Sequence, residues 1–334
     1  MKSRRDAILE GSKAAARLHD ELEMMRRQVE AQASSVDVFG TIVRQRIPLV
    51  FKPLDGLLGA YLPRPIPGII VTTRRQLSVQ RFTGAHELGH ARMKHQVSLD
   101  DESMLTRAES PTAEYDPLET AANAFATDFL LPQWLLISQA ARHKWSRKDF
   151  TDPSVVYQLS LRAGASFQAT LLALLRHNLI VQQTFDALRD TEVKRLKQEL
   201  LDGHALENWY PDVWILTEAD EGSMIEGDSR DAFVLRLKES SGAGYLWNVE
   251  DLRNAGFLLF RDDRLLPDAD DDIGGDVERI VSARPGENRV GRITLQQTRP
   301  WQSSGEPISR LSFAFDLRGK ESGRPRAERR FATV

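Results

Sequence analysis

Apolar residues recur every three or four positions over most of the first 200 residues, a spacing typical of helices that bury one face. Short β-branched runs bounded by proline or glycine interrupt this pattern and predict strands at 47–51 and 68–72, and the turn-rich stretch between them offers a further candidate strand at 57–61. The first part of the chain is therefore expected to be mainly helical, with a small sheet. The predicted helices cover 4–32, 37–46 and 76–95, a segment from Glu119 that stops at Pro132, and much of 133–200.

The pattern changes near residue 200. The segment 201–213 contains glycine, proline and asparagine and predicts a linker. Beyond it, apolar and polar residues alternate in short runs separated by turn residues, which is the pattern of half-buried strands. Seven such runs predict an all-β sandwich. They are 213–217, 233–238, 244–249, 256–260, 277–283, 292–298 and 311–317.

The composition limits the chemistry that the chain can perform. Its 334 residues include no cysteine, which excludes disulfides, thiolate nucleophiles, cysteine-ligated zinc and iron–sulfur clusters. The net charge of −3 does not favour nucleic-acid binding by the chain as a whole. No signal-like or membrane-spanning apolar segment is evident, so we expect a cytoplasmic protein. Any metal site must use histidine, aspartate or glutamate.

The sequence His-Glu-Leu-Gly-His begins at position 86 and is the strongest candidate for chemistry. On a helix, His86 and His90 lie one turn apart on one face, so both imidazoles can bind one zinc ion. Glu87 lies about 100° away around the helix, at the edge of that face, where its carboxylate can touch a metal-bound water. His95 lies about 140° around the helix from His90, and we expect it to be a polar residue near the helix end, outside the site.

A catalytic zinc ion usually has three protein ligands, so two histidines are one short. A histidine six residues after the second would complete one known arrangement, but that position holds Gln96. Glu119 opens the next predicted helix and can supply a carboxylate; equally, it can be a helix N-terminal charge favoured by the macrodipole. Asn123 lies one turn further along the same face, where it can hydrogen-bond a metal ligand.

Two segments, RFTGAHELGH and ETAANAFATDFLLP, resemble the ImmA/IrrE family of metallopeptidases in their order and spacing. The resemblance covers about residues 35–180 and implies a zincin-like core. It implies that His86, His90 and Glu119 hold zinc and that Glu87 is the general base. The same ligand set also accepts manganese.

The family resemblance also bears on partners and location. Known members cleave helix-turn-helix repressors of the Xre type, so the resemblance implies a cytoplasmic bacterial or phage-type protein that acts on a DNA-binding repressor. The residue that stabilises the oxyanion stays open among Tyr115, Arg81 and His95, because the spacing selects none of them.

The segment 155–180 resembles the helix-turn-helix-like part that follows the peptidase core in this family. Gly164 can make the turn, and Ser166 can cap the following helix. That second helix is mostly alanine and leucine, with Arg176 near its end, and carries no groove-reading side chains at its start. We therefore expect it to pack against the peptidase core rather than bind DNA.

A second resemblance lies within about 212–318, to chagasin-type cysteine-peptidase inhibitors, which are immunoglobulin-like sandwiches. Three loops of that family match in order, but the Asn-Pro-Thr-Thr run of the first loop is replaced by Ser-Ser-Gly-Ala at 240–243. The resemblance implies a partner-binding surface, although Trp247 and Trp301 can equally be core or loop-anchoring residues. The matching residues are Tyr245, Trp247, Gly274, Gly275, Arg299, Pro300 and Trp301.

Together these features predict an α+β chain with an N-terminal helix at 1–34, a zincin-like core at 35–140, a helix-turn-helix-like extension at 141–200 and an immunoglobulin-like sandwich at 212–320. The favoured function is a zinc endopeptidase that cleaves a repressor, with the sandwich recognising a partner or covering the zinc cleft as an autoinhibitor. The alternatives are a non-catalytic binding protein on a zincin scaffold, and a cysteine-peptidase inhibitor that acts through the sandwich.

Overall fold

The computed structural model describes residues 3–31, 33–96, 98–101, 115–203, 210–265, 277–302 and 305–327. The chain forms two compact units, and each unit is assembled from separated stretches of sequence. A boundary drawn along the sequence at 140 or 200 therefore does not separate them. The first unit comprises Met1–Ser138, Arg162–Asp186 and Lys320–Val334, and the second comprises Gln139–Leu161 and Ala187–Gly319.

The predicted helix over 4–32 is two helices, α1 (Arg4–Glu21) and α2 (Met24–Ala31). Ser3 and Asp6 form a capping box that begins α1. The break falls at Glu23, whose backbone adopts a left-handed conformation with φ of 48° that no helix interior allows. The next helix, α3 (Val38–Arg44), begins at Asp37, whose carboxylate accepts a hydrogen bond from the backbone N–H of Gly40.

A four-stranded sheet lies in the first unit, with strand order β1-β3-β2-β4. The parallel pair β1–β3 is extended by β2, which runs antiparallel to both β3 and β4. The sequence predicts the first three strands but not β4, because its residues Ser-Leu-Asp-Asp are too few and too polar to show a strand pattern. The strands are β1 (Leu49–Lys52), β2 (Leu57–Leu62), β3 (Gly68–Thr72) and β4 (Ser98–Asp101).

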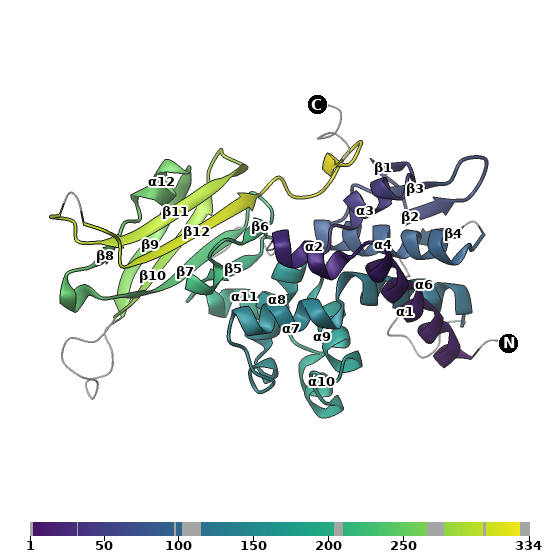
Figure 1. The fold of residues 1–334 in the computed structure, drawn as a ribbon, viewed down its shortest axis with the longest axis horizontal. Coiled ribbons are helices and arrows are strands. Elements are labelled where there is room, and N and C mark those ends of the chain that lie inside the picture. The colour runs from purple at the N-terminus through teal and green to yellow at the C-terminus, as the bar shows by residue number, and fades with distance from the viewer. Residues whose placement is uncertain are drawn as a thin grey trace. The chain divides into compact units, whose positions relative to one another are not determined.

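The helix α4 (Leu77–Met93) packs between this sheet and the helix α6 (Pro117–Leu130) (Figure 1). Asp116 caps the start of α6, where Pro117 occupies the first turn, so the helix begins two residues before Glu119. It ends at Leu130, shortly before Pro132, as the sequence predicts. The N-terminal helix α1 packs along α6 and also contacts α4.

The helices after α6 include the predicted turn. Gly164 has a φ of 67° and joins α8 to α9, and the Ser166 hydroxyl accepts a hydrogen bond from the backbone N–H of Ala169. Arg176 of α9 donates hydrogen bonds to Asp128 and Ser12, so its guanidinium is engaged inside the first unit. The elements are α7 (Gln133–Arg142), η1 (Asp149–Thr151), α8 (Pro153–Ala163), α9 (Phe167–Arg176), α10 (Gln182–Leu188) and α11 (Val193–Leu200).

The second unit contains two four-stranded sheets, with strand orders β5-β7-β10-β9 and β6-β12-β11-β8 (Figure 1). All seven predicted strands are present, and the short β6 is an additional one. The predicted order of a helical region with a small sheet followed by a β-rich region is confirmed. The strands are β5 (Val213–Leu216), β6 (Met224–Glu226), β7 (Ala232–Glu239), β8 (Leu246–Trp247), β9 (Phe257–Leu265), β10 (Val277–Pro285), β11 (Val290–Thr298) and β12 (Ser309–Asp316).

Aromatic side chains fill the core between the two sheets. Phe257 makes edge-to-face contacts with Phe233 of β7 and Phe315 of β12, and all three are at most 3% exposed. The short elements η2 (Glu218–Asp220), η3 (Ser241–Ala243) and α12 (Glu250–Asn254) lie in the connections.

The edge strand β5 is bound by side chains of α8. The Tyr157 hydroxyl accepts a hydrogen bond from the Val213 N–H and donates one to Asp212. Gln158 donates to the carbonyl of Val213 and accepts from the N–H of Ile215. The backbone of this edge strand is thus satisfied within the second unit.

Among the described residues, no helix is long and apolar enough to cross a membrane.

Candidate metal centre

The first two candidate ligands lie on the buried face of α4. His86 and Glu87 are fully buried, and His90 is 1% exposed. One helical turn separates the two histidines, so their Nε2 atoms approach to 2.9 Å. The flanking small residues Ala85 and Gly89 let the surrounding elements pack closely against this helix.

Glu119 supplies the third candidate ligand from the first turn of α6. Its two carboxylate oxygens lie 3.2 Å from His86 Nε2 and 3.5 Å from His90 Nε2. The three residues form a group whose ligand atoms all lie within 4.8 Å of one another. The structure therefore brings together the two histidines from one helix and the carboxylate from another, as the family resemblance implies.

The pKa of Glu119 reflects this setting. Burial raises it, but hydrogen bonds and charge interactions with His86 and His90 outweigh burial and hold it well below its usual range. The Glu119 carboxylate is thus present as an anion, the form that binds a cation.

Asn123 lies one turn beyond Glu119 on α6. Its Oδ1 is 2.9 Å from Nδ1 of His86. An amide oxygen only accepts hydrogen bonds, so Nδ1 of His86 carries a ring proton, and Nε2, which faces His90 and Glu119, is the nitrogen that can bind a metal. This arrangement fixes the tautomer that a metal ligand needs.

His95 stays outside the three-residue group, as expected, but it contacts one of the candidate ligands, which was not expected. The Nδ1 atoms of His95 and His90 are 3.0 Å apart. A helical wheel does not describe this contact, because α4 ends at Met93 and Lys94 adopts a left-handed conformation with φ of 59° that folds the chain back. His95 is therefore a partner of a candidate ligand, although it does not belong to the three-residue group.

The backbone of β2 passes close to Glu87. A methyl group on Gly59 would lie 2.4 Å from Thr83 Cγ2 and 3.1 Å from Glu87 Oε1. Because only hydrogen fits there, β2 forms a wall that limits where the Glu87 carboxylate can lie.

Of the oxyanion candidates, Arg81 is buried against the α8–α9 turn, where its guanidinium lies beside Gly164. Tyr115 immediately precedes the cap of α6, and His95 contacts His90. The structure does not single out one of them.

The donor atoms suit a divalent metal ion. Two imidazole nitrogens and one carboxylate oxygen are typical ligands of zinc and of several neighbouring transition metals. With bonds of about 2.0–2.1 Å, tetrahedral ligands lie about 3.3–3.4 Å from one another. The two Nε2 atoms are 2.9 Å apart and lie 3.2 and 3.5 Å from the two different oxygens of Glu119, so all three residues can reach one ion. The residues present therefore fit the metal that the sequence implies.

The candidate residues of the sandwich divide into a core residue and a surface group. Trp247 is 2% exposed and belongs to the core, so its indole is not available to a partner. Trp301 is 68% exposed, and next to it the Arg299 guanidinium lies 4.5 Å from the centre of the Tyr245 ring. Pro300 is also exposed. Gly274 and Gly275 lie outside the described residues.

Comparison with known proteins finds similarities in both parts of the chain. Residues 44–175 match the family model of the IrrE N-terminal-like domain, a peptidase family. The C-terminal region resembles amoebiasin-2 of Entamoeba histolytica, with 26% identity over 110 residues, which are 33% of this chain and 89% of that protein.

Two solved structures are also similar. A cysteine protease inhibitor from Entamoeba histolytica matches with 21% identity and a TM-score of 0.27, covering 32% of this chain and 96% of that one. The solution structure of amebosin matches with 18% identity and a TM-score of 0.25, covering 32% and 97%. The chain thus carries an IrrE N-terminal-like metallopeptidase domain with a His-His-Glu cluster, and a C-terminal region that resembles amoebiasin-2.

Proposed function

We propose that the IrrE N-terminal-like domain of this chain is a zinc-dependent endopeptidase. The observation that carries the proposal is the convergence of His86, His90 and Glu119, with Glu87 next to His86 on the same buried helix. A divalent metal held by these ligands would polarise the scissile carbonyl and activate water.

The remaining chemistry belongs to the side chains. Glu87 takes a proton at its carboxylate from the attacking water and delivers it to the leaving amine. Asn123 contacts Nδ1 of His86, and His95 contacts Nδ1 of His90. Each contact holds the ring of a candidate ligand in its orientation. Burial of Glu87 and both histidines excludes bulk water from the base and from two of the three ligands.

We propose a cytoplasmic DNA-binding repressor of the helix-turn-helix type as the substrate. The support is the likeness of residues 44–175 to the IrrE N-terminal-like domain. Arg176 of α9 donates hydrogen bonds to Asp128 and Ser12, so its guanidinium is already bound within the first unit. This agrees with a protein rather than DNA as the partner of the chain.

Substituting Glu87→Gln tests the catalytic proposal. New protein N-termini are compared between cells that express the wild-type chain and cells that express the variant, and the zinc content of both purified proteins is measured. We expect N-termini that depend on the wild type, with one from a repressor, and equal zinc in both proteins because Glu87 is not a ligand. Identical N-termini with equal zinc would instead support a non-catalytic binding protein on a zincin scaffold.

A second proposed function concerns the sandwich. Trp301 is 68% exposed on a loop beside Tyr245 and Arg299, and large exposed aromatic residues are typical anchors of protein interfaces. We propose that this surface recognises the peptidase substrate or another protein partner. The Trp301→Ala variant separates the alternatives: slower cleavage supports substrate recognition, and faster cleavage supports autoinhibition. Inhibition of papain by the full chain, lost in the variant, supports a cysteine-peptidase inhibitor.

A further inference from the structure

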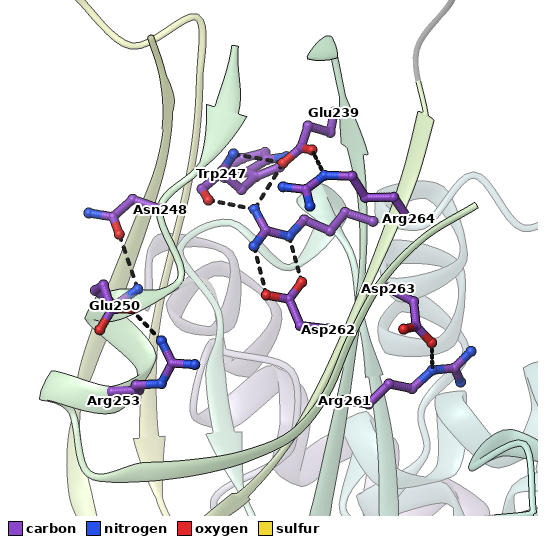
Figure 2. Close-up of polar contacts among 10 residues, drawn as sticks. Glu239, Trp247, Asn248, Glu250, Arg253, Arg261, Asp262, Asp263 and Arg264 are labelled. Atoms are coloured by element: carbon purple, nitrogen blue, oxygen red, sulfur yellow. Dashed lines mark hydrogen bonds and ion pairs between the residues drawn. The ribbon is translucent and has the colours of Figure 1, made fainter. Parts of the chain in front are cut away.

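A buried carboxylate, that of Glu239, connects the two ends of the loop 240–246. Glu239 is the last residue of β7 and is fully buried. Its Oε2 accepts a hydrogen bond of 2.9 Å from the backbone N–H of Trp247, the residue that follows the loop. Figure 2 shows this contact, together with the Arg264 side chain that donates to the other oxygen at 2.5 Å. The two ends of the loop are therefore joined through a side chain as well as through the chain itself.

Arg279 of β10 binds both Glu239 and the backbone of Trp247. Its guanidinium donates to Glu239 Oε2 at 3.0 Å and to the carbonyl of Trp247 at 2.7 Å. Its other nitrogens bind the two oxygens of Asp262, each at 2.9 Å. Both backbone polar groups of Trp247 are thus bound by one buried ion pair, and Arg279 itself is only 5% exposed.

The loop that carries Arg299 and Trp301 packs against the loop 240–246. Arg299 Nε donates to the carbonyl of Ala243 at 3.1 Å, and its guanidinium stacks over the Tyr245 ring. The indole of Trp301 lies against Gly244, where a methyl group would be 2.5 Å from Cη2 and where φ is 80°. The exposed Trp301 is therefore supported by the conformation of the loop that Glu239 and Arg279 hold.

Stability alone does not account for a buried ion pair at this position. Removing a carboxylate and a guanidinium from water costs several kcal/mol each, and a well-packed apolar pair often gives equal or greater stability. What an apolar pair cannot supply is an acceptor for the Trp247 N–H together with a donor for its carbonyl. The charges are thus matched to the backbone of the loop end.

We propose that Glu239 and Arg279 are positioning residues that hold the loop 240–246 in one conformation and so preform the surface of Tyr245, Arg299 and Trp301. This proposal rests on the recognition role proposed above for the sandwich. A partner would then dock on an ordered surface and would not have to order the loops on binding.

The test is hydrogen exchange of the full chain with Arg279→Met, compared with Lys197→Met. Lys197 is a matched control, because it is a buried cation of the same unit, 6% exposed, which bonds Asp212 and the carbonyl of Pro211. We expect the amides of 240–247 to exchange at least about tenfold faster in Arg279→Met, with strands β5 and β7 little affected. We expect Lys197→Met to leave the loop amides at the wild-type rate.

Glu239→Gln is the second variant and keeps the side-chain shape. Its amide cannot accept from Trp247 and Arg264 and also pair with Arg279, so we expect the loop amides to exchange faster than in the wild type. It also serves if Arg279→Met fails to fold. Loop amides that exchange at the wild-type rate in a folded variant, or that accelerate equally in Lys197→Met, would overturn the proposal.

This measurement needs no partner. If the loop loosens in the variants while Trp301→Ala changes neither cleavage nor papain inhibition, the positioning role stands and the recognition role fails. If Trp301→Ala has an effect but the loop does not loosen, the recognition role stands and the positioning role fails.

Discussion

At the scale of single residues, contacts to the Nδ1 atoms of the two ligand histidines orient the candidate metal centre. Nδ1 of His86 faces the amide oxygen of Asn123, and Nδ1 of His90 faces a second imidazole, that of His95. Hydrogen bonds of this kind fix the tautomer and orientation of a ligating histidine and raise its basicity. The orientation of the two histidine rings thus depends on Asn123 and His95 as well as on the helix that carries the histidines.

We predict that His95→Phe weakens zinc binding by about 10–100-fold, because the ring nitrogen of His90 loses its partner while the bulk at position 95 is kept. Competition with a chromophoric chelator measures the affinity directly and does not depend on activity. His95→Gln is the matched control, since its amide oxygen can accept from His90 and should restore most of the affinity. Equal affinities in all three proteins would show that His95 does not position the ligand.

Asp231 gives the sandwich a pH dependence. It is buried and accepts hydrogen bonds from the backbone of Asp212 and Asp228 and from the Trp214 indole. Burial, and next the negative charge of Asp212, raise its pKa from 3.8 to about 7. The folded chain therefore binds this proton more tightly than the unfolded chain does, so the contribution to stability is fully present below about pH 4 and is lost as the pH rises to about 7.

We predict that the free energy of unfolding of the second unit falls as the pH rises from 5 to 7, by up to about 1.4 kcal/mol per pH unit from this residue. Asp231→Asn should reduce that slope, even though its NH₂ group costs some stability where it meets an N–H donor. Urea unfolding at several pH values, followed by tryptophan fluorescence, gives both slopes. The same slope in the two proteins would assign the pH dependence to another group.

At the scale of elements, the site depends on how three helices cross. Glu119 can reach the histidines of α4 only if α6 is held against α4, and α1 packs along α6 and contacts α4 as well. The closest approach is at Gly11, where a methyl group would lie 2.0 Å from the carbonyl oxygen of Ala121 and 2.8 Å from the N–H nitrogen of Phe125. This glycine lets α1 support the helix that carries the third ligand.

We predict that Gly11→Ala destabilises the first unit by about 1–3 kcal/mol and weakens zinc binding, because the added methyl group pushes α6 and Glu119 out of place. Thermal unfolding and chelator competition measure the two effects. Gly68→Ala in β3 is the control, since a methyl group there meets nothing closer than 3.8 Å. A variant that is as stable as the wild type would mean that α1 can shift without moving α6.

The sequence predicts those parts of the site that local spacing determines. His86, Glu87 and His90 follow from one helical turn, and Glu119 follows from the start of the next helix and from the family resemblance. The contact of His95 with His90 was missed because one left-handed residue redirects the chain, and helical periodicity carries no information about where a helix ends. In the sandwich, the strands follow from alternation, but the burial of Trp247 depends on packing between two sheets.

At the scale of the whole molecule, the chain leaves the first unit, builds the sandwich and then returns. Gly323 exchanges two backbone hydrogen bonds with Phe51 of β1, at 2.8 and 3.0 Å. Glu321 exchanges two more with the Gln80 side chain of α4, at 2.7 and 3.1 Å. No pattern in the sequence predicts this return, because both contacts join residues more than 240 positions apart and the segment carries no apolar periodicity.

We predict that ending the chain at Gly319 lowers the melting temperature of the first unit, because Gln80, which is fully buried, keeps only its bond to the carbonyl of Thr72. An unsatisfied buried polar group costs about 1–3 kcal/mol, and each kcal/mol lowers the melting temperature by about 2–4 °C in a unit of this size. The transition of the second unit should not move.

A second substitution distinguishes the loss of these bonds from general damage. In the shortened chain, Gln80→Leu should raise the stability, because it removes the polar group that has lost its partners. In the full chain the same change should lower it, because the N–H and carbonyl of Glu321 then lose theirs. These opposite signs follow only if Gln80 and Glu321 are bonded in solution, so the same sign in both chains would contradict the return of the C-terminal segment to α4.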